Sequence, residues 1–425
     1  MKKNYRPRVV EATIRRKLRS AGAILLEGAK WCGKTTTADQ FARSRIFLAS
    51  PSKGKEYLRL AEVSPYQILE GETPRLIDEW QLAPQLWDAV RGEVDERGEK
   101  GQFILTGSAT PPDTENIHHT GTGRFSWITM RPMSLFESGD STGEVSLGEL
   151  FESDTRIAGH RETTIDDVCF WICRGGWPST IGLDREDALD QAYDYFDATV
   201  KTDMAESGST TRAIDRMRLF MKAYARHQGS QMSINKLRAD MIPNDSERIN
   251  EETVAAFHRR LKDIFAVEDM PAWNPNIRSK SSIRTTETRY FVDPSIATSS
   301  LGVGPEDLKK DLVSLGLFFE TMAVRDLRVY AQVLNGDIRH YRDSTGLECD
   351  AVVHLRDGRY GLIEIKLGGD RLIEEGVVTL KKVADRIDTD KMSTPAFLMV
   401  LTGVGEYAYR REDGVLVVPL STLRN

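Results

Sequence analysis

The stretch Ala23-Ile-Leu-Leu-Glu-Gly28-Ala-Lys-Trp-Cys-Gly33-Lys34-Thr35-Thr-Thr37 decides how the first part of the chain folds. An apolar run that predicts a strand stands directly before Gly28, and sequence that predicts a helix follows Gly33. Glycines let the backbone curl so that successive N–H groups point at phosphate oxygens, and the positive end of the helix adds to this attraction. The stretch therefore predicts a phosphate-binding loop, whose nucleotide-binding residues we expect to be Gly28, Ala29, Lys30, Trp31, Cys32, Gly33, Lys34, Thr35 and Thr36.

Two side chains of this loop have predicted roles. Lys34 is expected to reach the β and γ phosphates of a nucleotide, and the Thr35 hydroxyl is expected to bind Mg²⁺. The alternative is a glycine turn followed by a surface lysine. The full motif between a strand and a helix favours the phosphate-binding interpretation.

A second run, Arg75-Leu-Ile-Asp78-Glu79, ends in two carboxylates. A phosphate-binding loop needs an acid on a neighbouring strand to hold the metal, and we expect Asp78 to do so while Glu79 polarises the attacking water. The alternative is a strand end with two solvated acids. The position of this run after the loop favours the catalytic interpretation.

The first 135 residues alternate β-rich runs with helical stretches, which is typical of a mostly parallel α/β sheet. The helical stretch runs from Gln85 to Glu96 and repeats apolar residues at helical spacing. We predict strands at 23–27, 45–49, 75–78, 102–106 and 126–130.

The rest of the chain changes pattern twice. Residues 136–226 are expected to be helical, with a turn at Arg-Gly-Gly-Trp-Pro178, and residues 227–283 to form a winged helix from two helices and a strand pair. Strands return in residues 284–425, which predicts a second α/β domain. The expected fold class is thus α/β, with a phosphate-binding domain at 1–135, a helical and winged-helix middle, and a closing α/β domain.

A second constellation lies in the closing domain. Asp350 begins one predicted strand, and Glu364 and Lys366 stand two apart on the next, so their side chains share a face. Two carboxylates can hold a divalent cation, and a lysine can activate a water at a phosphodiester. This pattern is similar to the PD-(D/E)XK nuclease fold, with Glu320 on an upstream helix as a third acid and Glu348 as a further candidate. The alternative is a surface ion pair on a half-exposed strand.

Composition limits the class of protein and its partners. The 425-residue chain carries a net charge of −6, so any contact with nucleic acid must use a local basic patch. Its four cysteines are too scattered for a disulfide framework, which agrees with a reducing compartment. The basic N-terminus lacks a following apolar segment, and no stretch approaches the length of a bilayer span. We therefore expect a cytoplasmic protein without a membrane partner.

The order of motifs resembles a family, the bacterial and archaeal predicted AAA+ ATPases whose ATPase domain precedes a C-terminal domain of unknown function. The resemblance rests on YRPRVVEATI, GAKWCGKTT, RLIDEWQLAPQLWDAVR, FILTGSAT, GTGRF, RPMSLFE, RGGWP, RYFVDPSIA, LFFETMAVRDL, YRDSTGLECDAVVH and GLIEIKLG. It implies an ATPase core, a winged-helix region and a nuclease-like terminal domain. It carries functional roles onto Lys34, Thr35, Asp78, Glu79, Ser108, Glu320, Asp350, Glu364 and Lys366. The family more often has a smaller, or an Arg- or Gln-containing, loop interior than the Ala-Lys-Trp-Cys found here, so Trp31 and Cys32 are a departure.

Two further residues take expected roles from this class of ATPase. Ser108, with Thr106 behind it, follows a predicted strand where such enzymes carry a polar residue that senses the γ-phosphate; the alternative is a turn hydroxyl. Arg124 could stabilise transition-state charge, from its own chain or from a neighbour in a homo-oligomer; an exposed basic residue is the alternative.

The expected cofactors are ATP and Mg²⁺, with a second divalent metal at Asp350 and Glu364. ATP is favoured over GTP because the guanine-reading signature is missing. Three functions stay open: an ATPase that drives rearrangement of the other domains on DNA or another nucleic acid, an ATP-regulated metal-dependent nuclease, and a regulatory ATPase whose terminal domain binds nucleic acid or protein without cutting.

Overall fold

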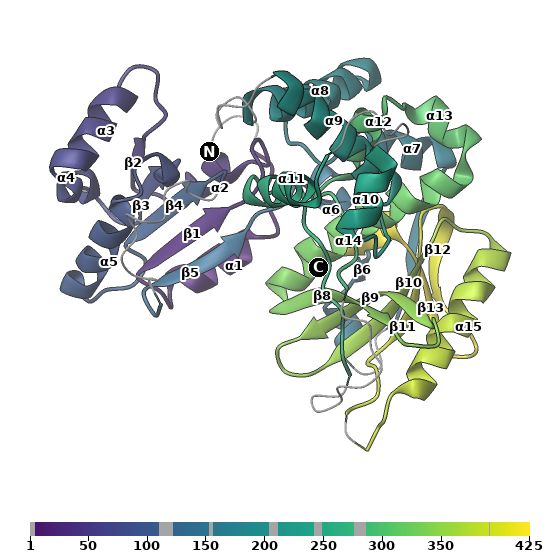
Figure 1. Ribbon diagram of the computed structural model, residues 1–425. Coiled ribbons are helices and arrows are strands. Elements are labelled where there is room, and N and C mark those ends of the chain that lie inside the picture. The colour runs from purple at the N-terminus through teal and green to yellow at the C-terminus, as the bar shows by residue number, and fades with distance from the viewer. Residues whose placement is uncertain are drawn as a thin grey trace. The chain divides into compact units, whose positions relative to one another are not determined.

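The computed structural model describes residues 5–109, 122–152, 156–203, 211–241, 249–275, 286–390 and 392–425 (Figure 1). The chain divides into two compact units. The first comprises Met1–Arg131 with Asp263–Phe265, and the second comprises Pro132–Lys262 with Ala266–Asn425. No helix in the described ranges combines the length and the apolar character needed to cross a bilayer.

The first unit is built on a five-stranded sheet in which every pair of neighbours is parallel. Its order is β2-β3-β4-β1-β5. The strands are β1 (Ala23–Glu27), β2 (Ser44–Phe47), β3 (Arg75–Asp78), β4 (Phe103–Gly107) and β5 (Phe125–Thr129). The predicted parallel α/β sheet is therefore confirmed, with strand ends that shift by one or two residues where they differ.

Helices cover both faces of this sheet. The helices are α1 (Glu11–Leu18), α2 (Lys34–Ala38), α3 (Gly54–Val63), α4 (Pro65–Leu69) and α5 (Leu86–Arg97), with a 3-10 turn η1 (Trp80–Leu82) after β3. Alternate strand residues such as Leu25, Ile77 and Leu105 form one core with α3, α4 and α5. Helix α1 packs against β1 and β5 (Figure 1). Strand residues that alternate in this way face opposite sides, so both faces need a cover.

The second unit contains a seven-stranded mixed sheet in the order β7-β12-β13-β11-β10-β9-β8. Strands β10, β11 and β13 run parallel, and the other neighbours are antiparallel. Helices α14 (Leu312–Val333) and α15 (Asp370–Arg386) pack on it. The strands are β7 (Gly159–Thr163), β8 (Gly336–Arg342), β9 (Glu348–Leu355), β10 (Tyr360–Lys366), β11 (Leu398–Thr402), β12 (Gly405–Arg410) and β13 (Leu416–Pro419).

Residues 136–226, expected to be helical, also contribute strands. Strand β7 pairs with β12, and β6 (Val145–Ser146) pairs with β14 (Leu423–Arg424) in a separate two-stranded sheet. These strands are short and their partners are far away in sequence, so local periodicity could not reveal them. The helices of this stretch are α6 (Leu135–Ser138), α7 (Ile165–Arg174) and α8 (Arg185–Ala198), followed by a π-helical turn η3 (Thr199–Asp203) and by α9 (Thr211–Arg226).

The region predicted as a winged helix holds α10 (Ile234–Met241) and α11 (Glu251–Asp263). Three isolated bridges among the described residues follow α11 and join Val267 to Phe291, Met270 to Thr288 and Ala272 to His340. Residues 242–248 and 276–283 of the predicted region lie outside the described residues. After Phe291 come α12 (Pro294–Leu301) and α13 (Pro305–Lys310).

A buried ion network ties α14 to two distant loops. The Arg325 guanidinium contacts Asp293 and Asp326, each at 2.8 Å, and all three side chains are at most 2% exposed. The second oxygen of Asp326 accepts the Leu135 N–H at 2.8 Å, and Asp293 accepts the Gly176 N–H at 2.9 Å. Removing one partner of such a buried pair typically costs about 3–5 kcal/mol, because the other charge is left without compensation. The network therefore fixes the turns at 134–135 and 175–176 against the helix.

Candidate functional site

The predicted phosphate-binding loop lies between β1 and α2, at the carboxyl end of the parallel sheet. Gly28 has φ 149°, and a Cβ there would stand 2.0 Å from the Met130 carbonyl oxygen. Gly33 has φ 100° and is the N-cap residue directly before α2. Residues with side chains rarely adopt such angles, so both glycines are required by the conformation of the loop. The loop thus has the tight curl that the motif predicts.

The ammonium of Lys34 folds back over this curl. Its Nζ donates hydrogen bonds to the carbonyl oxygens of Gly28 and Ala29, each at 2.8 Å, and the side chain is buried. Phosphate oxygens are stronger acceptors for an ammonium than neutral carbonyls because the bond is between opposite charges. The lysine is therefore held in the loop, where it can exchange these acceptors for phosphate.

The Asp78 carboxylate joins two neighbouring strands to the loop. Its Oδ1 accepts hydrogen bonds from the hydroxyls of Thr35 and Thr106, both at 2.6 Å. Burial raises the pKa of Asp78, while the two hydroxyls and the Lys34 charge oppose that rise. Hydroxyl and carboxylate oxygens are the ligands that Mg²⁺ prefers, so Thr35 and Asp78 fit a magnesium ion bound beside the loop.

Glu79, Ser108 and Gln81 form a second group at the same edge. The Ser108 hydroxyl donates to Glu79 Oε2 at 2.9 Å, and Gln81 Nε2 donates both to Glu79 Oε2 and, at 3.4 Å, to Ser108 Oγ. Glu79 has φ 56°, and its N–H donates to Thr106 Oγ1 at 3.3 Å. A left-handed conformation costs a residue with a side chain about 1–2 kcal/mol, so the carboxylate is held in place by its surroundings.

The other predicted loop residues differ in exposure. Ala29 and Cys32 are buried, and the Cys32 thiol donates to the Met130 carbonyl at 3.4 Å. Trp31 is 56% exposed and has φ 64°. Lys30 and Thr36 are half-buried.

Arg8 is a residue of this site that sequence reasoning did not assign. Its guanidinium is buried and donates to the Cys32 carbonyl at 2.7 Å and to the Arg131 carbonyl at 2.8 Å. It therefore braces the loop from the chain's N-terminal segment. Gln81 was missed as well. The only signals in the sequence were Arg8 within YRPRVVEATI and Gln81 two residues after Glu79, and neither spacing by itself implies a contact.

Arg124 lies at the amino-terminal ends of the strands, opposite the end of the sheet that carries the loop. Its carbonyl accepts the N–H of Ala23, at the start of β1, whereas the loop follows the end of β1. Its exposed guanidinium pairs with Asp95 of α5 at 2.8 Å. The structure therefore does not bring Arg124 to the phosphate loop of its own chain.

In the second unit, Asp350 of β9 meets Glu364 and Lys366 of β10. The register pairs Ile363 with Ala351, and just beyond it Asp350 Oδ2 accepts the Ile365 N–H at 2.8 Å. Lys366 Nζ lies 2.7 Å from Glu364 Oε2 and 3.3 Å from Asp350 Oδ2. Strand pairing thus brings together the three residues predicted from their spacing.

Glu364 is the unusual member of this group. Its side chain is 3% exposed, and among the described residues its Oε1 has no hydrogen-bond partner. Burial, followed by the Asp350 charge, raises the pKa of Glu364 well above its ordinary value, although Lys366 opposes the rise. Burial alone would lower the pKa of Lys366, but the neighbouring Asp350 and Glu364 carboxylates outweigh burial and raise it. A buried carboxylate oxygen without a partner is costly and fits a cation or a proton.

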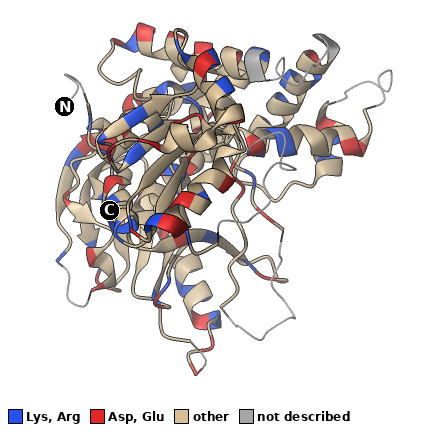
Figure 2. Ribbon diagram, turned by 90° about the vertical axis from the view of Figure 1, so that its left-hand side faces the viewer, with Lys and Arg blue, Asp and Glu red and all other residues tan. Residues whose placement is uncertain are grey.

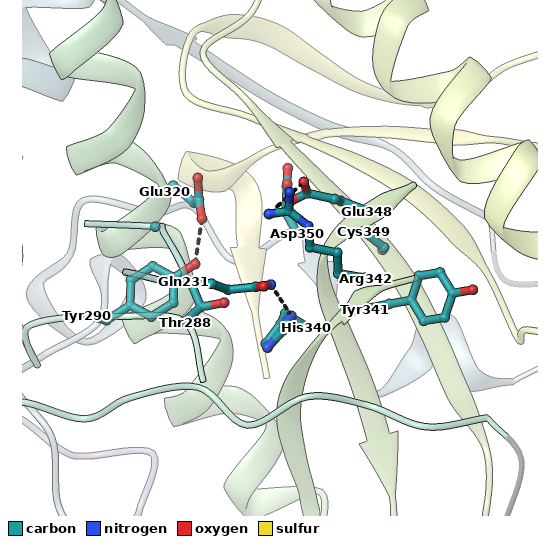
Figure 3. A pocket seen from close by; sticks show the side chains of 11 residues that line it. Gln231, Thr288, Tyr290, Glu320, His340, Tyr341, Arg342, Glu348, Cys349 and Asp350 are labelled. Carbon is teal, nitrogen blue, oxygen red and sulfur yellow. Dashed lines mark hydrogen bonds and ion pairs between the residues drawn. The ribbon is translucent and has the colours of Figure 1, made fainter. Parts of the chain in front are cut away.

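Glu320 faces the same region from α14. Its carboxylate accepts a hydrogen bond from the Tyr290 hydroxyl, and burial together with the Asp350 charge raises its pKa. Figure 3 shows a small pocket in which Tyr290 and Glu320 stand on one side and Asp350 and Glu348 on the other. Glu348 pairs with Arg342 at 3.0 Å. Gln231, Thr288 and His340 also line the pocket.

Within the described residues, no three His, Cys, Asp or Glu side chains converge closely enough to hold a metal ion. Glu320 therefore does not complete a three-carboxylate set with Asp350 and Glu364. A metal at this site would be held by two carboxylates with water or phosphate oxygens as its other ligands, which is the usual way in which proteins bind Mg²⁺.

Comparison with known families adds three matches. Residues 20–138 match a family described as AAA domain. Residues 165–307 match the domain of unknown function DUF8612, and residues 315–423 match the domain of unknown function DUF4143. No curated protein matches the chain. The first match supports an ATPase-type function for the unit that carries the phosphate loop.

The buried Glu364 gives a pH dependence of stability. Because its native pKa is raised, the folded chain keeps a proton that the unfolded chain releases above the ordinary value of 4.5, so stability falls as the pH rises from there through the native pKa. Glu364→Gln removes this titration. We expect the variant to match the parent near pH 5 and to unfold at a higher temperature than the parent near pH 9, measured by circular dichroism.

The matched control is Glu375→Gln, which changes an exposed carboxylate on α15. It should leave the pH dependence unchanged. If Glu364→Gln and the parent lose stability equally with rising pH, Glu364 is ionised across this pH range and its native pKa is not raised.

Proposed function

We propose that this chain binds ATP with Mg²⁺ at its phosphate loop, hydrolyses the ATP, and couples its nucleotide state to a nuclease-like second unit that acts on nucleic acid. The observation that supports hydrolysis most directly is the hydrogen bonding of Thr35 and Thr106 to Asp78 beside the Glu79–Ser108 pair. The match of this unit to an AAA domain supports the same class of activity.

Each residue has a task in this proposal. The curled backbone after Gly28 supplies N–H donors to the phosphates, and Lys34 compensates their charge. Thr35 and Asp78 hold Mg²⁺, which neutralises charge on the phosphates when bound. Glu79 accepts a proton from the attacking water, and Ser108 reports on the γ-phosphate through its hydrogen bond to Glu79.

Two substitutions test the hydrolytic site. Lys34→Ala should abolish ATP turnover because the phosphate charge loses its partner. Glu79→Gln should keep ATP binding but lower kcat by about 100-fold or more, since a general base contributes on the order of 10²–10⁴. Phosphate release and the binding of a fluorescent ATP analogue measure the two effects.

Lys100→Ala, which removes an exposed lysine of the same unit, serves as the control and should retain full turnover. Normal turnover by the Lys34 variant would sink the proposal, because the loop would then not be the catalytic site.

The proposed action on nucleic acid rests on the second unit. Helices α9 to α11 and the bridges after α11 are compatible with a winged helix. Figure 2 shows basic and acidic residues interspersed along the ribbon on the side in view. Because the chain carries a net charge of −6, binding to nucleic acid would use a local contact and not a broad positive field.

Cleavage by the second unit is the alternative function, and one observation favours it. Glu364 carries a buried oxygen with no partner among the described residues, beside Asp350 and Lys366. A divalent cation would give this oxygen a partner, and Lys366 would stabilise charge on a phosphodiester. The arrangement supports a PD-(D/E)XK-like nuclease whose activity depends on metal.

The test uses single- and double-stranded DNA and RNA with Mg²⁺ or Mn²⁺, in the presence and absence of ATP. If the second unit is a nuclease, Asp350→Ala and Lys366→Ala should each abolish cleavage. Asp357→Ala, on the exposed turn between the same two strands, should not affect it.

Absence of cleavage by the parent chain, with an ATPase rate that responds to nucleic acid, would instead support the third function, a terminal domain that binds without cutting.

A contribution of Arg124 would require a second copy. Because Arg124 lies at the end of the sheet opposite the loop, it could reach only the phosphate site of a neighbouring chain. We therefore keep an arginine acting between subunits as part of the proposal for a homo-oligomer.

A further inference from the structure

Gln81 connects Glu79 and Ser108, the two polar side chains with proposed roles in activating the attacking water. Gln81 is the second residue of η1, the short helix that follows the left-handed residue Glu79. Its Nε2 donates to both Glu79 Oε2 and Ser108 Oγ. Glu79 comes from the end of β3 and Ser108 from the end of β4. The amide thus bridges two strand ends that have no backbone pairing at this level, since the registered β3–β4 ladder ends at Ile77 and Leu105.

The orientation of this amide is fixed by chemistry. An ionised carboxylate can only accept hydrogen bonds, so the NH₂ group of Gln81 must face Glu79 and the oxygen must face away. That oxygen, Oε1, is buried and has no hydrogen-bond partner among the described residues. A buried acceptor without a partner is unfavourable, so the hydrogen bonds of Nε2 to Glu79 and Ser108 are what hold the amide in this pose.

The space for this amide is provided by Gly107. A Cβ at position 107 would lie 3.2 Å from Gln81 Oε1 and 3.0 Å from Trp80 Nε1. The φ of Gly107 is not in the left-handed region, so its backbone conformation does not require glycine. Glycine at position 107 therefore leaves the space that the side chains of η1 occupy. Gln81 is packed into its position against β4.

We propose that Gln81 is a positioning residue of the hydrolytic site, which holds the Glu79 carboxylate beside Ser108 through the hydrogen bonds of its Nε2. This inference rests on the proposed ATPase function. Glu79 remains the base that takes the proton from water, and Gln81 transfers no proton. A small displacement of a catalytic group can cost about 100-fold in rate, so a residue that only orients can still matter greatly.

The test replaces Gln81 by methionine, which has a similar length but cannot make these hydrogen bonds. Gln81→Met should lower kcat by about 10- to 100-fold, while the affinity for ATP stays within about threefold of the parent. In a Glu79→Gln background the same change should lower the single-turnover rate by less than about threefold, because its effect depends on Glu79. Gln85→Met, four residues further on, is the matched control and should leave kcat unchanged.

Three results would overturn the inference: a kcat within about twofold of the parent, an affinity for ATP that falls in step with kcat, or a full-sized loss in the Glu79→Gln background. Thermal unfolding of Gln81→Met, expected to match the parent, separates these results from misfolding. The Lys34→Ala variant is measured beside it. If it lacks turnover and Gln81→Met is normal, the ATPase function holds and only the role of Gln81 fails; a parent chain without turnover overturns both.

Discussion

The parallel direction of the strands in the first unit is the constraint on which its site depends. Because all neighbouring strands of the five-stranded sheet are parallel, their carboxyl ends lie at the same end of the sheet. Three segments that are far apart in sequence therefore meet there: the loop after β1, Asp78 and Glu79 at the end of β3, and Ser108 after β4. The Asp78 carboxylate then fastens this end, because one oxygen accepts hydroxyls from the loop and from β4. The same constraint places Arg124, before β5, at the other end.

The second unit depends on a different interaction, the buried Arg325 between Asp293 and Asp326. Buried charges are tolerated only when their hydrogen bonds are satisfied, and here backbone N–H groups of two turns complete the carboxylates. The network holds α14, which carries Glu320 toward the pocket beside Asp350. The ion pairs of Arg325 and Asp326 lie on α14 between one and two turns away from Glu320. They therefore help to set the position of Glu320 at the second site.

The sequence predicted the first sheet and the approach of Asp350, Glu364 and Lys366 well, because both follow from local periodicity and strand pairing. It did not predict β6 or β7, which are short and pair with strands far away in sequence. It also missed Arg8 and Gln81, whose roles arise from tertiary contacts to carbonyl and carboxylate groups. Glu320 was expected as a metal ligand. Its burial and the nearby Asp350 charge, which raise the pKa of its carboxyl, arise from the fold and are not encoded in a motif.

The most direct test of the account is calorimetric titration of the intact chain with ATP, once with Mg²⁺ and once with a chelator. The account predicts a single nucleotide bound per chain, with higher affinity when Mg²⁺ is present, because Thr35 and Asp78 would then hold the metal that bridges to the phosphates. Failure to bind ATP in either condition, or the same affinity with the chelator as with Mg²⁺, would contradict it.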